Sequence, residues 1–389
     1  MKKETRVNHP PRVELAPDNR PVVAPIYQSV KFELGSLAET ERLMRGERSG
    51  FFYSRASNPT TRQLELLLAE LQGREDCLVT ASGVAAISNA LLALTRQGDH
   101  VLTFIETYDP TRYLVRRLLG RYGVTNTLLS IEDLQGLEQA LASRPTRLVL
   151  FESPTNPVTK IADIAALTRL AHAAGALVVM DNTFAGFHQH GQYEVDVFLH
   201  SLTKYASGAG DVMGGAVIGR SEIIRGMRAD FNALGATLDP HAAFLILRGL
   251  KTYFVRYQAQ CASAARIATM LVGHPAVERA HYPGLATHPQ HALAQAQMRD
   301  FGTIVTFDLK GGLPAVARFA DALQLFVLTP SLGATESLVM TPQIARPRDL
   351  TPEQLMASAF TDGTVRLSIG LEDPEDLLKD LEQALAAAQ

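Results

Sequence analysis

Three stretches of the chain decide its fold: RLVLFESPTNP at 147–157, ALVVMDNTF at 176–184 and VDVFLHSLTKY at 195–205. Each contains a short, largely apolar run that ends in polar or charged residues. Comparable runs lie at 77–80, 100–104 and 215–218. Helical patterning separates these runs, at 61–72, 84–95, 113–122, 131–142 and 164–174. Apolar strands without alternation, separated by helices, predict an α/β fold with a mostly parallel sheet that is covered on both faces.

The remainder of the chain divides into two further parts. Residues 1–55 contain five prolines between positions 10 and 25 and have weak periodicity, which predicts an extended arm. Such arms often lie across another subunit, and a disordered tail is the alternative. We expect the sheet domain to span 56–250. A smaller α+β domain is expected over 251–389, ending in an amphipathic helix at 374–388.

Composition excludes several classes of protein. The 389 residues carry a formal net charge of −3, which argues against a polyanionic partner such as nucleic acid. Two cysteines cannot form a disulfide framework and indicate reduced thiols. No apolar run approaches the roughly 20 residues of a membrane span. The sequence therefore predicts a cytoplasmic protein that binds neither nucleic acid nor membrane.

Polar side chains follow the apolar runs at the carboxyl ends of the predicted strands, where open α/β sheets bind their ligands. Gly83 opens a helix directly after the run at 77–80, and free N–H groups at a helix start suit a phosphate. Asp181 ends an apolar strand and needs a cationic or protonated partner. Lys204 lies among small and hydroxyl residues between two apolar strands, which predicts a lowered pKa and a role as nucleophile or base.

Each of these residues also has an ordinary interpretation when it is taken alone. Gly83 would belong to an ordinary strand–helix turn, Asp181 would cap the next element, and Lys204 would extend to solvent. Together they match what pyridoxal phosphate requires: a lysine that holds its aldehyde as a Schiff base, an acid beside its pyridine nitrogen, and a helix start with hydroxyls for its phosphate. The sequence therefore predicts pyridoxal 5′-phosphate as the cofactor.

Seven ordered motifs point to a family. They are YSRASNPT at 53–60, SGVAAI at 82–87, ESPTNP at 152–157, DNTF at 181–184, SLTKY at 201–205, SLGATESL at 331–338 and VRLSIGLED at 365–373. Through them the chain resembles the pyridoxal-phosphate enzymes of cysteine and methionine metabolism, from about residue 25 almost to the C-terminus. The resemblance implies the type I fold of pyridoxal-phosphate-dependent transferases, which is aspartate-aminotransferase-like, with a mostly parallel sheet in the large domain and a smaller α+β C-terminal domain.

The resemblance also implies roles toward the cofactor. Lys204 would carry it and move protons at the Cα and Cβ atoms of the substrate. Asp181 would pair with the pyridinium, and Tyr108 would stack on the ring and assist proton transfer. The residues implied for the phosphate are Ser82, Gly83, Val84, Ser201 and Thr203.

Further residues are implied for the substrate and for a neighbouring subunit. Arg366 would bind the substrate α-carboxylate through its fork-shaped guanidinium, and Asn156 and Ser331 would complete the cofactor and carboxylate contacts. Tyr53 and Arg55 would reach the phosphate from a neighbouring subunit. The resemblance therefore implies a homo-oligomer, expected to be a homotetramer built of catalytic dimers.

Four positions near the substrate depart from the family pattern. Ala209 stands where a histidine is common, Pro110 replaces the cysteine of methionine γ-lyases, and Pro330 replaces a glutamate associated with the distal amino group of cystathionine. Arg346 lies in a stretch that replaces a His-Pro-Ala…His sequence and is expected to be a surface charge. These departures fit a γ-substituted amino acid of the methionine or homoserine type, so we predict a γ-lyase that performs α,γ-elimination.

Other functions stay open on the sequence. The second hypothesis is γ-replacement, as in O-acylhomoserine sulfhydrylase or cystathionine γ-synthase. The third hypothesis is a cystathionine β-lyase. A hypothesis of a different class is a protein that binds the cofactor but catalyses no reaction. The presence of Lys204, Tyr108 and Arg366 argues against it. We expect no metal site, because His188 and His190 lack a Cys, Asp or Glu at ligand spacing and are typical of a solvent-exposed loop.

Overall fold

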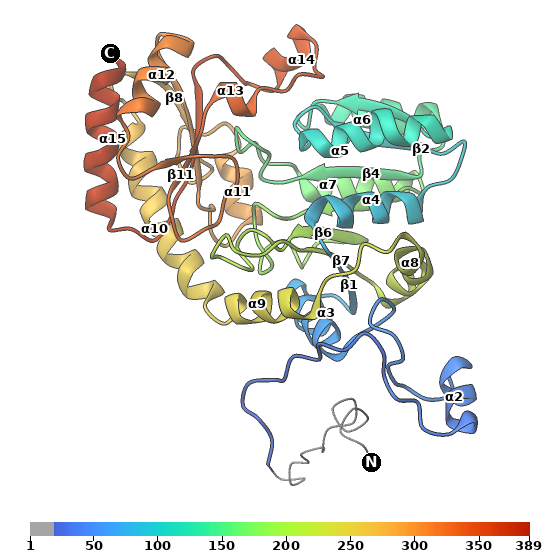
Figure 1. Cartoon of the computed structure of the whole chain (residues 1–389). Helices are drawn as coiled ribbons and strands as arrows, with labels where there is room; N and C mark the ends of the chain where they lie inside the picture. The colour runs from blue at the N-terminus through green and yellow to red at the C-terminus, as the bar shows by residue number, and fades with distance from the viewer. Residues whose placement is uncertain (1–18) are drawn as a thin grey trace.

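Residues 19–55 form an extended segment that contacts the body of the molecule at Tyr27 and Gln28. The computed structural model describes residues 19–389, so the first 18 residues of the predicted arm lie outside the described part. Helix α2 (Leu37–Met44) lies in this region, and Figure 1 shows it projecting from the body of the molecule. Several apolar side chains of the segment before α2 are exposed, among them Val22, Tyr27 and Val30.

Seven strands form the larger sheet, in the order β1-β7-β6-β5-β4-β2-β3. They are β1 (Asp76–Thr80), β2 (His100–Phe104), β3 (Thr125–Leu129), β4 (Leu148–Glu152), β5 (Leu177–Asp181), β6 (Val197–Ser201) and β7 (Gly215–Gly219). Only β7 is antiparallel to its neighbours, β1 and β6. The predicted α/β fold with a mostly parallel sheet is therefore confirmed.

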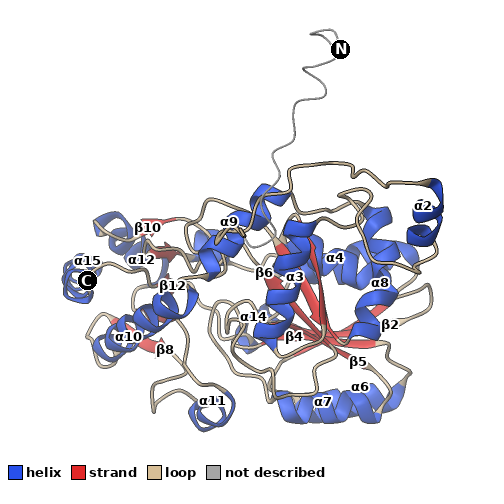
Figure 2. Cartoon of the chain, turned by 90° about the horizontal axis from the view of Figure 1, so that it is seen from below, coloured by secondary structure: helices blue, strands red, loops and turns tan. Residues whose placement is uncertain are grey.

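Helices cover both faces of this sheet, as strands without polar alternation require (Figure 2). One face is covered by α4 (Gly83–Leu94) and α8 (Ser221–Leu234). The other face is covered by α3 (Pro59–Gln72), α6 (Leu134–Ser143), α7 (Ile164–Ala173) and α9 (Pro240–Leu250). Successive residues of one strand, such as Val101 and Leu102, enter the two different hydrophobic clusters, so both faces of the sheet are buried.

A second, five-stranded sheet has the order β10-β11-β12-β9-β8, and all its pairs except β10–β11 are antiparallel. Its strands are β8 (Val277–His281), β9 (Ile304–Leu309), β10 (Val327–Leu328), β11 (Leu338–Met340) and β12 (Thr364–Ser368). Its own hydrophobic cluster includes residues of α10 (Tyr253–Leu271), α12 (Gly312–Ala322) and α15 (Pro374–Ala388). The shorter helices α11 (His291–Gln297), α13 (Pro342–Ala345) and α14 (Pro352–Ala357) lie in its connections. No helix within residues 19–389 is long and apolar enough to span a membrane.

The structure differs from the prediction where the sequence pattern is weak. The helix expected at 113–122 consists of three short pieces: α5 (Asp109–Tyr113), a π-helical turn at Leu114–Leu118 and a 3-10 turn at Leu119–Tyr122. Strand β3 was not predicted, because three of its five residues are polar. It lies at the edge of the sheet, where a strand need not be buried on both faces.

The segment that carries His188 and His190 is buried, so the expectation of a solvent-exposed loop is wrong. His190 is 1% exposed, and its Nδ1 lies 2.7 Å from Asn182 Oδ1. His188 packs against the rings of Tyr253 and Tyr257, which shield it from water. Both histidines are packing and hydrogen-bonding groups. Within residues 19–389, no three or more His, Cys, Asp or Glu side chains are grouped so that they could hold a metal ion.

Candidate active site

A cavity of about 360 Å³ lies at the carboxyl ends of β4, β5 and β6, beside the start of α4 and facing β12 of the second sheet. This is the edge at which open α/β sheets bind ligands. Its lining includes eleven of the thirteen site residues predicted from the sequence: Ser82, Gly83, Val84, Tyr108, Asn156, Asp181, Ser201, Thr203, Lys204, Ser331 and Arg366. The fold therefore brings together residues from both sheets.

The start of α4 lies close to the end of β6 and leaves its first N–H groups accessible to a ligand. Ser82 caps the helix, with its Oγ accepting the N–H of Ala85 at 3.1 Å. A Cβ atom on Gly83 would lie 2.8 Å from Cβ of Ser201, which no real side chain tolerates. Glycine therefore lets the helix start lie against the end of β6, and the N–H groups of a first helical turn favour an anion such as phosphate.

Lys204 follows β6 and reaches the centre of the cavity. Its Nζ donates a hydrogen bond to Ser331 Oγ at 2.8 Å. Burial, and the positive charge of Arg366, lower the pKa of Lys204 to about 8. A substantial fraction of this amine is consequently neutral near physiological pH, as a nucleophile or a base must be.

Two carboxyl groups lie side by side at the ends of neighbouring strands. Asp181 and Glu152 are paired across β5 and β4, and burial raises the pKa of both. For Glu152, burial and then the charge of Asp181 raise the pKa to about 8. No Lys, Arg or His among residues 19–389 forms an ion pair with Asp181, which leaves a protonated ring nitrogen as a suitable partner.

Glu152 is a site residue that the sequence reasoning missed. Its Oε2 accepts the backbone N–H of Tyr108 at 3.2 Å, and its Oε1 accepts the backbone N–H of Asn156 at 2.9 Å. It thus ties together two loops that line the cavity. The signal was present, because Glu152 ends an apolar strand in the same way as Asp181.

Arg366 lies in β12 and is 4% exposed. Its Nη1 donates to Asn156 Oδ1 at 2.8 Å, its Nη2 donates to the carbonyl oxygen of Ser331 at 2.5 Å, and its Nε has no partner. No carboxylate of the described residues pairs with it, and burial lowers its pKa to about 10. A buried guanidinium with a free donor and no counter-ion suits a ligand carboxylate.

Ser331 joins these cationic groups. Its backbone oxygen binds Arg366 and its hydroxyl binds Lys204. Its φ of 118° lies in a region that non-glycine residues rarely adopt. Such strain concentrates at functional sites, where the surrounding structure holds it in place.

Tyr108 stands at the mouth of the cavity, 40% exposed, directly before α5. Burial, and the nearby charge of Asp181, raise its pKa, so its hydroxyl is a proton donor at neutral pH. The ring is therefore available to a flat ligand held in the cavity.

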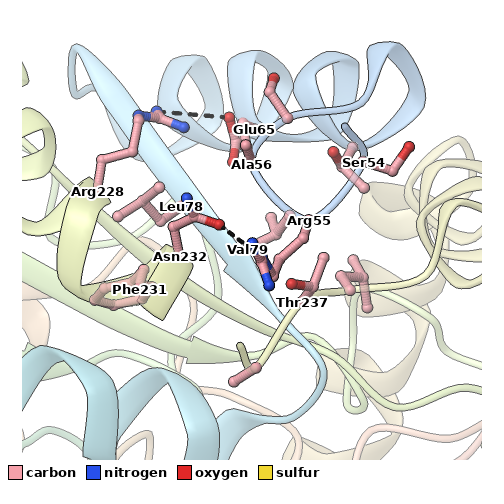
Figure 3. Close-up of a pocket in the computed structure, with 14 residues that line it drawn as sticks. Ser54, Arg55, Ala56, Glu65, Leu78, Val79, Arg228, Phe231, Asn232 and Thr237 are labelled. Carbon is pink, nitrogen blue, oxygen red and sulfur yellow. Dashed lines mark hydrogen bonds and ion pairs between the residues drawn. The ribbon is translucent and has the colours of Figure 1, made fainter. Parts of the chain in front are cut away.

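Tyr53 and Arg55, the two remaining predicted residues, lie outside this cavity. Arg55 lines a separate, smaller pocket between α3, β1 and α8, where its Nε donates to Asn232 Oδ1 at 3.1 Å (Figure 3). Its guanidinium lies 5.6 Å from the centre of the Tyr53 ring. Within one subunit, neither side chain lines the cavity that contains Lys204.

The cavity fits pyridoxal phosphate on several independent observations. It offers an amine with a lowered pKa, a carboxyl group that lacks a cation and a helix start that admits close approach. It also has the orphaned Nε of a buried arginine for a substrate carboxylate. These groups define the class of a pyridoxal-phosphate enzyme that acts on amino acids.

Comparisons with known proteins agree with this class. The family model described as Cys/Met metabolism PLP-dependent enzyme matches residues 8–386. L-methionine gamma-lyase of Pseudomonas putida is 42% identical over 371 residues, which cover 94% of this chain and 93% of that protein. O-succinylhomoserine sulfhydrylase of Pseudomonas aeruginosa is 38% identical over 364 residues, covering 93% and 90%.

A solved structure is also similar to this chain over nearly its whole length. The crystal structure of cystathionine gamma synthase from Xanthomonas oryzae pv. oryzae, in complex with aminoacrylate and cysteine, superposes with a TM-score of 0.89 at 38% identity, covering 94% of this chain and 93% of that one. The chain therefore belongs to the family of pyridoxal-phosphate-dependent enzymes of cysteine and methionine metabolism. Its cofactor is pyridoxal 5′-phosphate, and the predicted family, fold type and cofactor are confirmed.

Proposed function

We propose that the protein is a γ-lyase that performs α,γ-elimination on a γ-substituted L-amino acid of the methionine type. With methionine, one water is consumed and methanethiol, 2-oxobutanoate and ammonia are released, so all atoms balance. The relative named L-methionine gamma-lyase, 42% identical over 94% of the chain, supports this choice.

The observation that carries the proposal is the convergence of Lys204 and Arg366 on Ser331. If Arg366 holds the α-carboxylate of the substrate, the Cα atom bonded to that carboxylate lies beside the amine of Lys204. An amine in this position takes the proton from Cα and delivers or removes a proton at Cβ. Both proton transfers are steps of γ-elimination.

The cofactor and the remaining residues complete the assignment. Lys204 would hold the cofactor covalently and Asp181 would pair with its ring nitrogen. The start of α4, from Ser82 to Val84, would hold its phosphate, together with the hydroxyls of Ser201 and Thr203. When bound, pyridoxal phosphate stores the electron pair that proton removal leaves on the substrate. Tyr108 would stack on the cofactor ring and give a proton to the departing γ-heteroatom.

The leaving-group end of the cavity favours an uncharged substituent. Among the described lining residues, Asp181, Lys204 and Arg366 have the tasks assigned above at the cofactor and the α-carboxylate. Glu152 accepts backbone N–H groups from two loops, and its pKa, raised to about 8, keeps it largely protonated at neutral pH. The rest of the wall includes apolar residues: Phe184, Met213, Pro330, Leu332 and Met340. Desolvating a distal carboxylate or ammonium in such a wall is unfavourable, whereas a thioether fits it.

A second candidate is γ-replacement, in which a thiol takes the place of the acyloxy group at Cγ of a homoserine ester and the carboxylate is released. The similarity to an O-succinylhomoserine sulfhydrylase and to a cystathionine gamma synthase supports it. The two functions differ in their products. Replacement gives a new thioether and no ammonia, while elimination gives equal amounts of 2-oxo acid and ammonia.

A substrate panel separates these functions. The purified enzyme is supplied with methionine, O-acetylhomoserine, O-succinylhomoserine, cystathionine and cysteine, with and without an added thiol. We expect 2-oxobutanoate and ammonia in equal amounts, with methionine preferred. Lys204→Ala should abolish both the turnover and the visible absorption of the bound cofactor, while Lys310→Ala, a lysine on the surface, should leave both unchanged. Turnover confined to cysteine and other β-substituted amino acids contradicts the proposal.

The proposal includes a homo-oligomer built of catalytic dimers that pair into a homotetramer, with Tyr53 and Arg55 completing the phosphate site of the neighbouring subunit. Two observations support it: both side chains lie outside their own cavity, and the arm leaves apolar residues exposed. Mixing the inactive variants Arg55→Ala and Lys204→Ala should restore part of the activity, because one site of each mixed dimer is intact. No recovery on mixing contradicts the shared site, and sedimentation distinguishes dimer from tetramer.

We also propose a cytoplasmic location and a division of the chain near residues 55 and 250. Cys77 and Cys261 are free thiols, as the reducing cytoplasm favours. Cell fractionation tests the location, and limited proteolysis tests the divisions.

A further inference from the structure

Outside the cavity lining, one buried cation uses every donor that it has. Arg112 lies in α5, the helix that begins directly after Tyr108, and is 1% exposed. Its five N–H groups have five acceptors: the carbonyl oxygens of Ile105 (3.0 Å) and Thr107 from Nη1, the Oδ1 atoms of Asp109 (2.5 Å) and Asp349 (2.6 Å) from Nη2, and Oδ2 of Asp349 (3.1 Å) from Nε. A guanidinium has no further hydrogens to donate.

These contacts hold the backbone on both sides of Tyr108. The carbonyl of Thr107 and the carboxylate of Asp109 bind one guanidinium. Between them, the N–H of Tyr108 donates to Glu152, and its carbonyl oxygen accepts the N–H of Arg112 at 3.1 Å. The backbone that carries the Tyr108 ring is therefore held in place by Arg112 and Glu152.

The other edge of the same guanidinium reaches the second half of the chain. Both carboxylate oxygens of Asp349 bind Arg112, although 237 residues separate the two. Asp349 lies between α13 and α14, and Arg116 binds its Oδ2 at 2.9 Å and its carbonyl oxygen at 3.0 Å. Partial burial is the largest single influence and acts against ionisation, but the hydrogen bond and charge of Arg112 and the charge of Arg116 together outweigh it and lower the pKa of Asp349.

General stabilisation does not account for this arrangement. A buried ion pair contributes little net stability, because desolvation offsets its Coulomb energy. The α14 segment is also held elsewhere, by Lys160 Nζ, which donates to the carbonyl oxygen of Ala357 at 2.7 Å and to Glu106 at 3.1 Å. What Arg112 adds is a fixed geometry for the segment that carries Tyr108.

We propose that Arg112 and Asp349 are positioning residues, which hold Tyr108 over the cavity by tying its loop to the segment between α13 and α14. The proposal rests on the role of Tyr108 in the proposed function. Tyr108 acts when the γ-heteroatom leaves, while Arg366 binds the substrate. Loosening the contact with Asp349 consequently slows turnover and leaves substrate binding nearly intact.

The variant Asp349→Asn tests this role. It keeps the size of the side chain, which is 38% exposed, and removes one carboxylate oxygen and the charge. We expect kcat for methionine to fall roughly 10- to 100-fold, as displaced catalytic groups do, with KM changed less than about threefold and the visible absorption of the bound cofactor unaltered. Asp349→Glu, which restores the carboxylate, should recover part of kcat.

The matched control is Asp362→Asn. Asp362 forms an ion pair with Arg346 in the same part of the chain, without reaching α5. Its kcat should stay within about twofold of wild type. Equal kcat values for Asp349→Asn and Asp362→Asn, or a loss that appears in KM alone, overturn the proposal.

A double-mutant cycle with Tyr108→Phe separates this proposal from the proposed function. If Asp349 acts through Tyr108, Asp349→Asn causes no further loss of kcat in the Tyr108→Phe enzyme. Fully additive losses show that Asp349 acts elsewhere and overturn the positioning role alone. Full activity of Tyr108→Phe by itself removes the assigned role of Tyr108, and the positioning role with it.

Discussion

Replacing Arg366 by leucine should lower activity far more than stability, because this guanidinium is proposed to bind the substrate carboxylate while its own burial opposes folding. Arg366 is 4% exposed, its Nε has no partner, and no described carboxylate pairs with it. Removing one partner of a buried charge pair costs about 3–5 kcal/mol. If the substrate carboxylate is that partner, kcat/KM for methionine should fall roughly 100- to 5,000-fold, with 1.36 kcal/mol for each factor of ten.

The stability of the ligand-free protein should change far less. A pKa lowered from 12.5 to about 10 corresponds to about 3 kcal/mol against the charged form. Leucine relieves this penalty but leaves Asn156 Oδ1 and the carbonyl oxygen of Ser331 without a donor, at about 1–3 kcal/mol each. The opposing effects nearly cancel, so we expect Tm to stay within a few degrees of wild type.

Steady-state kinetics and thermal unfolding measure the two quantities, and Arg256→Leu is the matched control. Arg256 is also buried and binds only neutral acceptors, the carbonyl oxygens of Tyr205 and Gly249 and the hydroxyl of Thr252, but it does not line the cavity. It should lower Tm and change kcat/KM only a few-fold. A loss below tenfold in Arg366→Leu, or an equal loss on a substrate analogue without a carboxylate, refutes the reasoning.

Two further predictions concern the pH dependence of the cofactor-free protein. The pKa of Lys204 is about 8 in the folded protein and 10.5 in the unfolded chain, so burying the charged amine opposes folding by at most about 3 kcal/mol. This penalty is complete below pH 8 and disappears as the pH rises to 10.5. Lys204→Met should therefore be more stable than wild type in urea unfolding at pH 7, and a difference that does not shrink by pH 10 contradicts this. Glu152 has the opposite sign, since its pKa rises from 4.5 to about 8 on folding: its penalty appears as pH rises from 4.5 and is complete above 8. Glu152→Gln should thus gain more than about 1 kcal/mol on wild type between pH 5 and pH 8, and parallel pH curves would exclude a buried, protonated Glu152.

The sequence predicted the elements whose pattern follows from burial. Strands β4 and β5 are buried on both faces, so their residues form unbroken apolar runs. The terminal helix expected at 374–388 is found with those bounds, because one face packs into the second core. Strands β10 and β11 have two and three residues, too few to show a period, and the sequence did not reveal them.

The candidate site was predictable where chemistry is local in the chain. A lysine between hydroxyls and an aspartate after an apolar strand can be recognised without a structure, as Lys204 and Asp181 were. Contacts between residues that are far apart in the chain cannot be recognised in this way. Nothing in the sequence pairs Arg112 with Asp349, because only the packing of α5 against the segment after α13 brings them together.

The closeness of Lys204 to Arg366 also makes the base depend on the substrate. The positive charge of Arg366 adds to burial in lowering the pKa of Lys204. A carboxylate bound at Arg366 neutralises that charge, so the pKa of Lys204 rises once a substrate is present. A stronger base takes the Cα proton more readily. In the proposed function, Lys204 is released from the cofactor only when the substrate is bound, so an α-carboxylate held by Arg366 of the second sheet would make the released amine a stronger base than Arg366 alone would allow.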